Sequence, residues 1–186
     1  MQHPRPEQLT AAPANVQHAR SAARFGPLLG GAAAVVVLDQ VTKSLIRGWL
    51  AIGETWPGGW NLIRLTHVEN SGAAFGILQG GGGFLIVTSV VAIAAVAAFL
   101  WWAPPQARLF AVALSLILGG AIGNLIDRLA RGTVTDFIDP THYPAFNLAD
   151  SSIVIGVAVL AVLSLLEERA MRRDEGPSGS SAEGAP

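Results

Sequence analysis

Residues 84–103 read FLIVTSVVAIAAVAAFLWWA and contain no charged side chain. A helix of that length can cross the hydrocarbon core of a bilayer, which is about 30 Å thick. Three other apolar segments run roughly over residues 25–50, 109–126 and 146–166. A segment that crosses a bilayer must satisfy its own backbone hydrogen bonds. The four segments therefore predict an all-α polytopic membrane protein with four transmembrane helices.

The composition indicates a lipid-facing surface. Apolar residues make up 51% of the chain and charged residues only 13%, whereas a soluble domain carries about 25% charged residues. The net charge of −1 gives no electrostatic reason to expect a nucleic-acid partner. The chain has no cysteine, which excludes disulfides, a thiol nucleophile and a cysteine-based metal site.

The two ends of the chain differ from the apolar region. Residues 1–24 are rich in Ala, Pro, Gln and Arg, and residues 169–186 are rich in Gly, Ser, Pro and charged residues. Neither stretch has enough apolar surface to form a core, so we expect two disordered cytoplasmic tails. Residues 25–168 then form the four-helix membrane domain.

Residues 49–83 are too many for a tight turn between the first two helices. They contain a Pro-Gly-Gly turn at 57–59, followed by a run of β-forming residues over 61–68. We expect a short sheet here that rests on the outer membrane surface, with residues 80–83 as a flexible hinge into the second helix.

The arginines indicate the orientation of the bundle. Cytoplasmic loops carry the excess of Lys and Arg, and a topology with both termini inside places seven arginines on the inner side and four on the outer side. Trp101 and Trp102 suit the inner interface, and Trp49, Trp56 and Trp60 suit the outer one. We therefore expect both termini in the cytoplasm. The inner group is Arg5, Arg20, Arg24, Arg108, Arg169, Arg172 and Arg173, and the outer group is Arg47, Arg64, Arg128 and Arg131.

Ionisable and amide side chains gather at the outer ends of the predicted helices. A carboxylate near the bilayer centre costs roughly 2.5–3.5 kcal/mol on insertion scales, so such residues usually face the bundle interior and serve a function. Asp39 and Lys43 lie in the outer half of the first helix. The other members of the group are Asn70, Asn124, Asp127, Arg128, Asp136, Asn147 and Asp150.

Asp136 and Asp150 are the candidate catalytic residues. Asp136 follows the third helix and Asp150 lies in the first turn of the fourth, so the loop between them can bring both carboxyl groups together. Two carboxyl groups a few ångströms apart share a proton, because ionising both is costly. One can then activate a water while the other polarises a peptide carbonyl. In the alternative interpretation, Asp150 only charges its helix N-terminus and Asp136 is a solvated loop acid.

The remaining polar residues point less directly to chemistry. Asn124, Asp127 and Arg128 share one helical face, either as a helix end with a local ion pair or as support for the carboxyl groups. Asp39 and Lys43 are i, i+4 partners, and the favoured interpretation is a paired charge that fixes the first helix. The spacing of the histidines does not favour a metal site. No serine has a lysine or histidine at a spacing that would suit a serine nucleophile.

Five stretches, in order, closely resemble the lipoprotein signal peptidase (signal peptidase II) family, and the resemblance covers about residues 28–166. Five motifs in one order are highly specific. They are Asp39-Gln-Val-Thr-Lys43, Val68-Glu-Asn-Ser-Gly-Ala-Ala-Phe-Gly76, Gly119-Gly-Ala-Ile-Gly-Asn-Leu-Ile-Asp-Arg128, Gly132-Thr-Val-Thr-Asp-Phe-Ile138 and Phe146-Asn-Leu-Ala-Asp150.

The resemblance implies an intramembrane aspartic endopeptidase that cleaves diacylglyceryl-modified prolipoproteins just before the lipidated cysteine. It implies a bacterial inner-membrane enzyme without a cofactor, with a catalytic dyad of Asp136 and Asp150 at the outer face. It also implies a small extracytoplasmic β-cradle over residues 49–83. We expect a monomer in contact with membrane lipids. The supporting and substrate-binding residues implied by the matched motifs are Asn70, Gly72, Asn124, Arg128, Asn147, Asp39 and Lys43.

Two other functions remain open from the residues alone. A small ion- or proton-coupled transporter could relay ions through Asp39, Asp136 and Asp150. That function predicts polar residues throughout the membrane depth, yet the second helix and the body of the third carry no charge. A membrane scaffold or chaperone would not need two interfacial carboxyl groups with amide neighbours.

Overall fold

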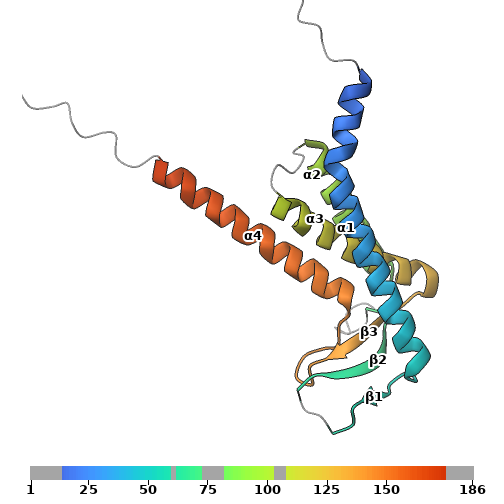
Figure 1. The fold of residues 1–186 in the computed structure, drawn as a ribbon. Helices are drawn as coiled ribbons and strands as arrows, with labels where there is room; N and C mark the ends of the chain where they lie inside the picture. The colour runs from blue at the N-terminus through green and yellow to red at the C-terminus, as the bar shows by residue number, and fades with distance from the viewer. Residues whose placement is uncertain (1–13, 60–61, 73–81, 103–107, 175–186) are drawn as a thin grey trace, which may run out of the picture.

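The computed structural model describes residues 14–59, 62–72, 82–102 and 108–174 (Figure 1). Its four helices are α1 (Ala14–Trp49), α2 (Gly82–Trp102), α3 (Arg108–Arg131) and α4 (Leu148–Asp174). Each contains a stretch that is long and apolar enough to cross a membrane. The predicted four-helix membrane architecture is confirmed.

Helix α3 is the centre of the bundle. It packs against α1, α2 and α4, and 56% of its most apolar stretch is buried, against 17% or less in the other three helices. Glycines make this close packing possible, because a Cβ atom at Gly119 would lie 2.7 Å from the Ala32 carbonyl oxygen of α1, and a Cβ atom at Gly120 would collide with the Ala149 carbonyl of α4. Beyond this contact the distal half of α4 diverges from α1 (Figure 1).

A three-stranded antiparallel sheet covers one end of the bundle. Its order is β1 (Thr55–Trp56), β2 (Arg64–Asn70) and β3 (Val134–Asp139). The first two strands come from the segment predicted to form a sheet. The third comes from the connection between α3 and α4, because its β-forming residues complete the hydrogen bonding of β2 and cover its free edge.

The β2–β3 register determines which side chains share a face. Val68 pairs with Asp136, Glu69 with Thr135 and Asn70 with Val134, and the register shifts between Leu65 and Val68. Side chains alternate between the two faces of a strand, and paired residues point to the same face. Asn70 and Asp136 therefore face one way, and Glu69 and Thr135 face the other.

The predicted boundaries of both tails require correction. Residues 14–24 and 169–174, expected within the disordered tails 1–24 and 169–186, belong to α1 and α4. Their Ala- and Arg-rich composition favours helix, so each helix continues past its apolar span. The rest of both tails, 1–13 and 175–186, lies outside the described residues. Residues 80–81 of the predicted hinge do so as well, and α2 begins at Gly82.

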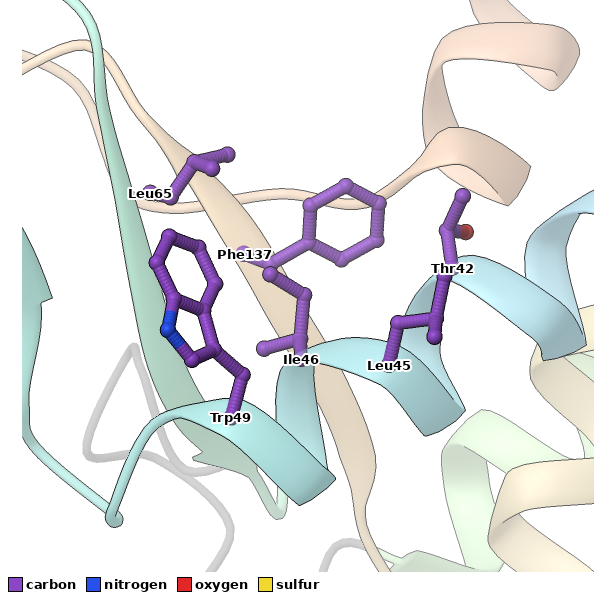
Figure 2. A pocket seen from close by; sticks show the side chains of 6 residues that line it. All are labelled: Thr42, Leu45, Ile46, Trp49, Leu65 and Phe137. Carbon is purple, nitrogen blue, oxygen red and sulfur yellow. The ribbon is translucent and has the colours of Figure 1, made fainter.

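The sheet is joined to the end of α1 by apolar contacts. Ile46 and Leu50 are buried there. An open groove of about 420 Å³ separates the last turns of α1 from the sheet, and its lining is almost entirely apolar (Figure 2). Its walls are Thr42, Leu45, Ile46, Trp49, Leu65 and Phe137.

The Gly119→Ala substitution should destabilise the bundle. A Cβ atom there would lie 2.6 Å from the Val35 Cβ and 2.7 Å from the Ala32 carbonyl oxygen, and the backbone oxygen cannot move aside. Overpacking of this kind costs about 1–3 kcal/mol, which outweighs the better helix propensity of Ala. Thermal unfolding of the purified protein in detergent measures the loss.

Gly30→Ala is the matched control on α1, because a Cβ atom at Gly30 meets no atom within 4 Å. Its midpoint temperature should stay the same or rise. Equal midpoints for the two variants would show that α1 and α3 do not pack as closely as described.

Candidate active site

Asp136 is buried at the junction of the sheet and the helices. Its side chain lies on β3 and is 2% exposed. Oδ2 accepts a hydrogen bond of 2.9 Å from Asn70 Nδ2 on β2. Oδ1 accepts one of 2.7 Å from Asn147 Nδ2, just before α4. Asp136 is therefore a desolvated carboxyl group with an amide donor on each oxygen.

Asp150 lies in the first turn of α4. Its backbone N–H donates to Asn147 Oδ1 at 2.9 Å, and its Oδ2 lies 3.3 Å from the Asn147 backbone nitrogen. This reciprocal arrangement caps the helix and holds the Asp150 side chain in place. Its other carboxyl oxygen, Oδ1, accepts a hydrogen bond of 2.7 Å from Asn124 Nδ2 on α3. Asp150 thus lies at the helix N-terminus, as the alternative interpretation held, and it also connects α4 to α3.

Asn147 joins the two acids. Its fully buried Nδ2 group donates to Asp136 Oδ1 and, over 3.1 Å, to Asn124 Oδ1. Its Oδ1 and backbone nitrogen bond Asp150. Both carboxyl groups therefore contact one asparagine at the same end of the bundle.

The environment favours a proton on Asp136. Burial raises its pKa and repulsion by Asp150 adds to the rise, while the hydrogen bonds from Asn70 and Asn147 oppose it. The net effect raises the pKa of Asp136 from 3.8 to about 6. Near neutral pH this group can exchange a proton, which an ordinary aspartate cannot.

A buried ion cluster lies beside the acids. Lys43 Nζ is 2.8 Å from Asp39 Oδ2, 2.9 Å from Asp127 Oδ2 and 2.9 Å from Asn124 Oδ1. The side chains of Lys43 and both aspartates have no exposed surface. Asp39 Oδ1 also accepts a hydrogen bond of 3.0 Å from the Ala149 backbone nitrogen. The predicted Asp39–Lys43 pair is confirmed, and it connects α1 to both α3 and α4.

Asp127 does not form the local ion pair considered for the end of α3. Its Oδ2 contacts Lys43 at an ion-pair distance without hydrogen-bond geometry, and its Oδ1 lies 3.9 Å from Arg47 Nη1. The structure thus directs Asp127 into the ion cluster of α1. The adjacent residue, Arg128, faces elsewhere.

Arg128 is a cation without a close carboxylate partner among the described residues. Its Nη1 donates to Ser89 Oγ on α2 at 2.9 Å, and its buried Nε has no hydrogen-bond partner in the described part of the chain. It lies within electrostatic reach of Asp136 and Asp150. The arrangement leaves donors available near the two acids.

Gly72 orients Asn70. Its backbone N–H donates to Asn70 Oδ1 at 2.8 Å, which directs the amide nitrogen of Asn70 toward Asp136. Gly72 has a φ of 81°, a conformation that favours glycine, and a Cβ atom there would collide with Leu85 of α2.

Comparison with known proteins identifies the family of the chain. The family model for signal peptidase (SPase) II matches residues 31–166, which is well over half of the chain. The chain belongs to the signal peptidase II family. The lipoprotein signal peptidase of Halalkalibacterium halodurans is 42% identical over 145 residues, covering 76% of this chain and 93% of that protein. The one from Syntrophotalea carbinolica is 46% identical over 146 residues, covering 74% and 90%.

Two solved structures of bacterial membrane enzymes share the fold. One has a TM-score of 0.70 and 36% identity, covering 76% of this chain and 94% of its own. The other has a TM-score of 0.68 and 32% identity, covering 86% and 96%. All nine residues proposed from the sequence lie inside the region that matches the signal peptidase II family. Their individual roles remain predictions.

Sequence reasoning missed two supporting residues of this signal peptidase II family member. Gln40 Nε2 lies 3.1 Å from the Gly123 carbonyl oxygen and 3.3 Å from both Asp39 Oδ2 and Asp127 Oδ1. Its place inside the matched Asp39–Lys43 motif could have indicated it. Ser89, the partner of Arg128, lies in an otherwise apolar helix, and its sequence context gave no signal.

Lys43→Met should destabilise the protein strongly. The substitution keeps most of the side-chain volume but leaves Asp39 and Asp127 buried without their cation. Breaking a buried pair in this way costs about 3–5 kcal/mol. Chemical or thermal unfolding in detergent measures the change.

Arg172→Met is the matched control, because Arg172 pairs with Glu168 on the exposed end of α4. An exposed pair contributes about 0–1 kcal/mol. If Lys43→Met cost no more than this control, the ion cluster would not hold α1 in the bundle.

Proposed function

We propose that this protein is an intramembrane aspartic endopeptidase that removes the signal peptide from diacylglyceryl-modified prolipoproteins, just before the lipidated cysteine. Membership of the signal peptidase II family supports a hydrolase that cleaves signal peptides from prolipoproteins. The relatives named above are lipoprotein signal peptidases. The observation that supports the aspartic mechanism is the contact of Asn147 with both Asp136 and Asp150.

The two acids act as a general acid and a general base. Asp136 carries the shared proton, and Asp150 is the ionised base. Asp150 takes a proton from a water, and the oxygen of that water attacks the scissile carbonyl carbon. Asp136 donates its proton to the carbonyl oxygen, which gives a neutral tetrahedral diol. Asp150 then returns its proton to the leaving nitrogen as the C–N bond breaks, and Asp136 recovers a proton from the diol. No side-chain nucleophile is needed.

The amides and Arg128 prepare this reaction. Asn70, Asn147 and Asn124 donate to the carboxyl oxygens and fix their separation. The unpartnered Nε of Arg128 can bind a peptide carbonyl of the substrate. Orienting reacting groups before the reaction removes much of the entropic barrier.

The chemistry of the substrate suggests the membrane placement. A signal peptide is an apolar helix, and its lipidated cysteine lies at the membrane interface. We place the sheet end of the bundle, with the dyad, at the outer face of the bacterial cytoplasmic membrane and both termini in the cytoplasm. The enzyme works as a monomer surrounded by lipid.

Transport is the weaker alternative. A proton or ion path would need charged groups along the membrane depth, but α2 carries no charge and the ionised groups of α3 lie at its two ends. Family membership also favours hydrolysis.

Asp136→Asn and Asp150→Asn should each abolish cleavage, because each removes one member of the acid–base pair. General acid–base catalysis contributes about 100- to 10,000-fold, so turnover should fall by at least that range. Release of the signal peptide from a diacylglyceryl-modified precursor, followed by gel shift in detergent, measures the effect.

Asp139→Asn is the matched control on the same strand, since Asp139 pairs with Arg64 at 2.5 Å at the far end of β3. It should cleave at nearly the normal rate. Normal turnover in either dyad variant would rule out the aspartic mechanism.

The pH profile should report the proton on Asp136. Because the pKa of Asp136 is raised to about 6, the proton is present below that pH and is lost as pH rises through it. The value of kcat/KM for the free enzyme should therefore decline on an alkaline limb centred near pH 6. Asn70→Ala should move this limb to higher pH, because the Asn70 hydrogen bond lowers the pKa.

A profile that rises through pH 6 and stays level above it would contradict the assignment of the proton to Asp136. The measurement is initial rate against pH at low substrate concentration, with protein stability checked at each pH.

A further inference from the structure

A second polar network lies on the opposite face of the sheet from the two acids. The register pairs Val68 with Asp136 on one face and Glu69 with Thr135 on the other. The mechanism above uses neither Glu69 nor Thr135. Both are nevertheless adjacent in sequence to residues of the site.

Glu69 ties β2 to β3 through its side chain. Its Oε1 accepts a hydrogen bond of 3.0 Å from Thr135 Oγ1, and its Oε2 accepts one from Thr133 Oγ1. Thr135 lies on β3, and Thr133 directly precedes that strand. The carboxylate is largely shielded from water, with 21% of its side chain exposed. These bonds add a side-chain clamp to the backbone ladder.

His67 links Glu69 to the end of α1. Its Nδ1 lies 2.8 Å from the Leu50 carbonyl oxygen, and its Nε2 lies 3.0 Å from Glu69 Oε1. Both ring nitrogens therefore face an oxygen atom, one on the backbone and one on the carboxylate. Burial alone would raise the pKa of Glu69, but the hydrogen bonds from Thr133, His67 and Thr135 outweigh it and lower the pKa.

The clamp and the site share the same two strands. Thr135, which is fully buried, also accepts a hydrogen bond of 2.9 Å from Arg47 Nη1 of α1. Glu69 immediately precedes Asn70, and Thr135 immediately precedes Asp136. The bond between Asn70 and Asp136 is therefore directly behind the Glu69–Thr135 bond, with the sheet backbone between them.

We propose that Glu69, bonded by His67, Thr133 and Thr135, is a positioning residue that fixes the separation of Asn70 and Asp136 from the opposite face of the sheet. It touches neither the substrate nor the reacting atoms. The inference rests on the proposed function, because Glu69 acts through Asp136. A displacement of about 1 Å at a reacting group can lower the rate by about 100-fold.

The direction in which the pKa of Asp136 shifts distinguishes a lost charge at Glu69 from a displaced Asn70. Removing the negative charge of Glu69 without moving any atom would favour the ionised form of Asp136 and lower its pKa. Loss of the Asn70 hydrogen bond has the opposite effect and raises that pKa. The charged groups that act on Asp136 are Asp150, Lys43 and Arg128, and the titratable groups that face Glu69 are His67 and, through Thr135, Arg47.

The test is Glu69→Gln in the full chain, assayed in detergent with a diacylglyceryl-modified precursor. We expect kcat to fall roughly 10- to 100-fold with little change in KM. The alkaline limb of kcat/KM should move to higher pH, as in Asn70→Ala. The double variant Glu69→Gln/Asn70→Ala should show no further movement of the limb.

Thr133 provides a second variant that changes no charge. Thr133→Val removes one donor to Glu69 at constant volume and should move the limb in the same direction, while Thr133→Ser keeps the hydroxyl group and should restore the wild-type limb. This pair keeps the test valid if Glu69→Gln fails to fold.

Glu54→Gln is the matched control. The Glu54 side chain accepts a hydrogen bond of 2.8 Å from the Ala51 backbone nitrogen, just after α1, so this variant should keep both kcat and the position of the limb. A normal kcat in Glu69→Gln, an unmoved limb, or a limb at lower pH would overturn the positioning role. Failure of the proposed function is separate, because it would appear as normal turnover in Asp136→Asn.

Discussion

A carboxylate that is removed from water must receive hydrogen-bond donors or an opposite charge, because an unpaired buried charge is too costly to keep. This requirement organises the whole sheet end of the molecule. Each buried acid there contacts a cation or an amide, and each acid has at least one partner on another element. These bonds connect α1, α3, α4 and the sheet to one another.

The acids fall into two groups with different partners. Asp39 and Asp127 both contact the Lys43 ammonium, at 2.8 and 2.9 Å. Among the described residues, the hydrogen bonds to the carboxyl groups of Asp136 and Asp150 come from side-chain amides and one backbone N–H group. Amides stabilise a carboxyl group without demanding that it be charged, so one of this pair can hold a proton. Asn124 separates the two groups, since its oxygen faces Lys43 and its nitrogen faces Asp150.

The sequence predicted what depends on local pattern. An uncharged apolar run identifies a spanning helix wherever it occurs, and an i, i+4 spacing was sufficient for the Asp39–Lys43 pair. The sequence did not predict that β3 pairs with β2, because the two strands are more than 60 residues apart and neither strand has a pattern that specifies its partner. The network around Glu69 was missed for the same reason, as its members meet only after that pairing forms.

The glycines of α3 have a consequence for how a substrate arrives. Gly119 brings the backbone of α3 close to α1, and Gly120 brings it close to α4, so the three helices pack tightly at this level. On the proposed function, a lipid-anchored peptide would reach the acids sideways, between closely packed helices, by diffusing in the plane of the bilayer. The rate of encounter then depends on the number of precursor molecules per unit area of membrane and on membrane viscosity. The concentration of precursor per unit volume of solution does not determine it.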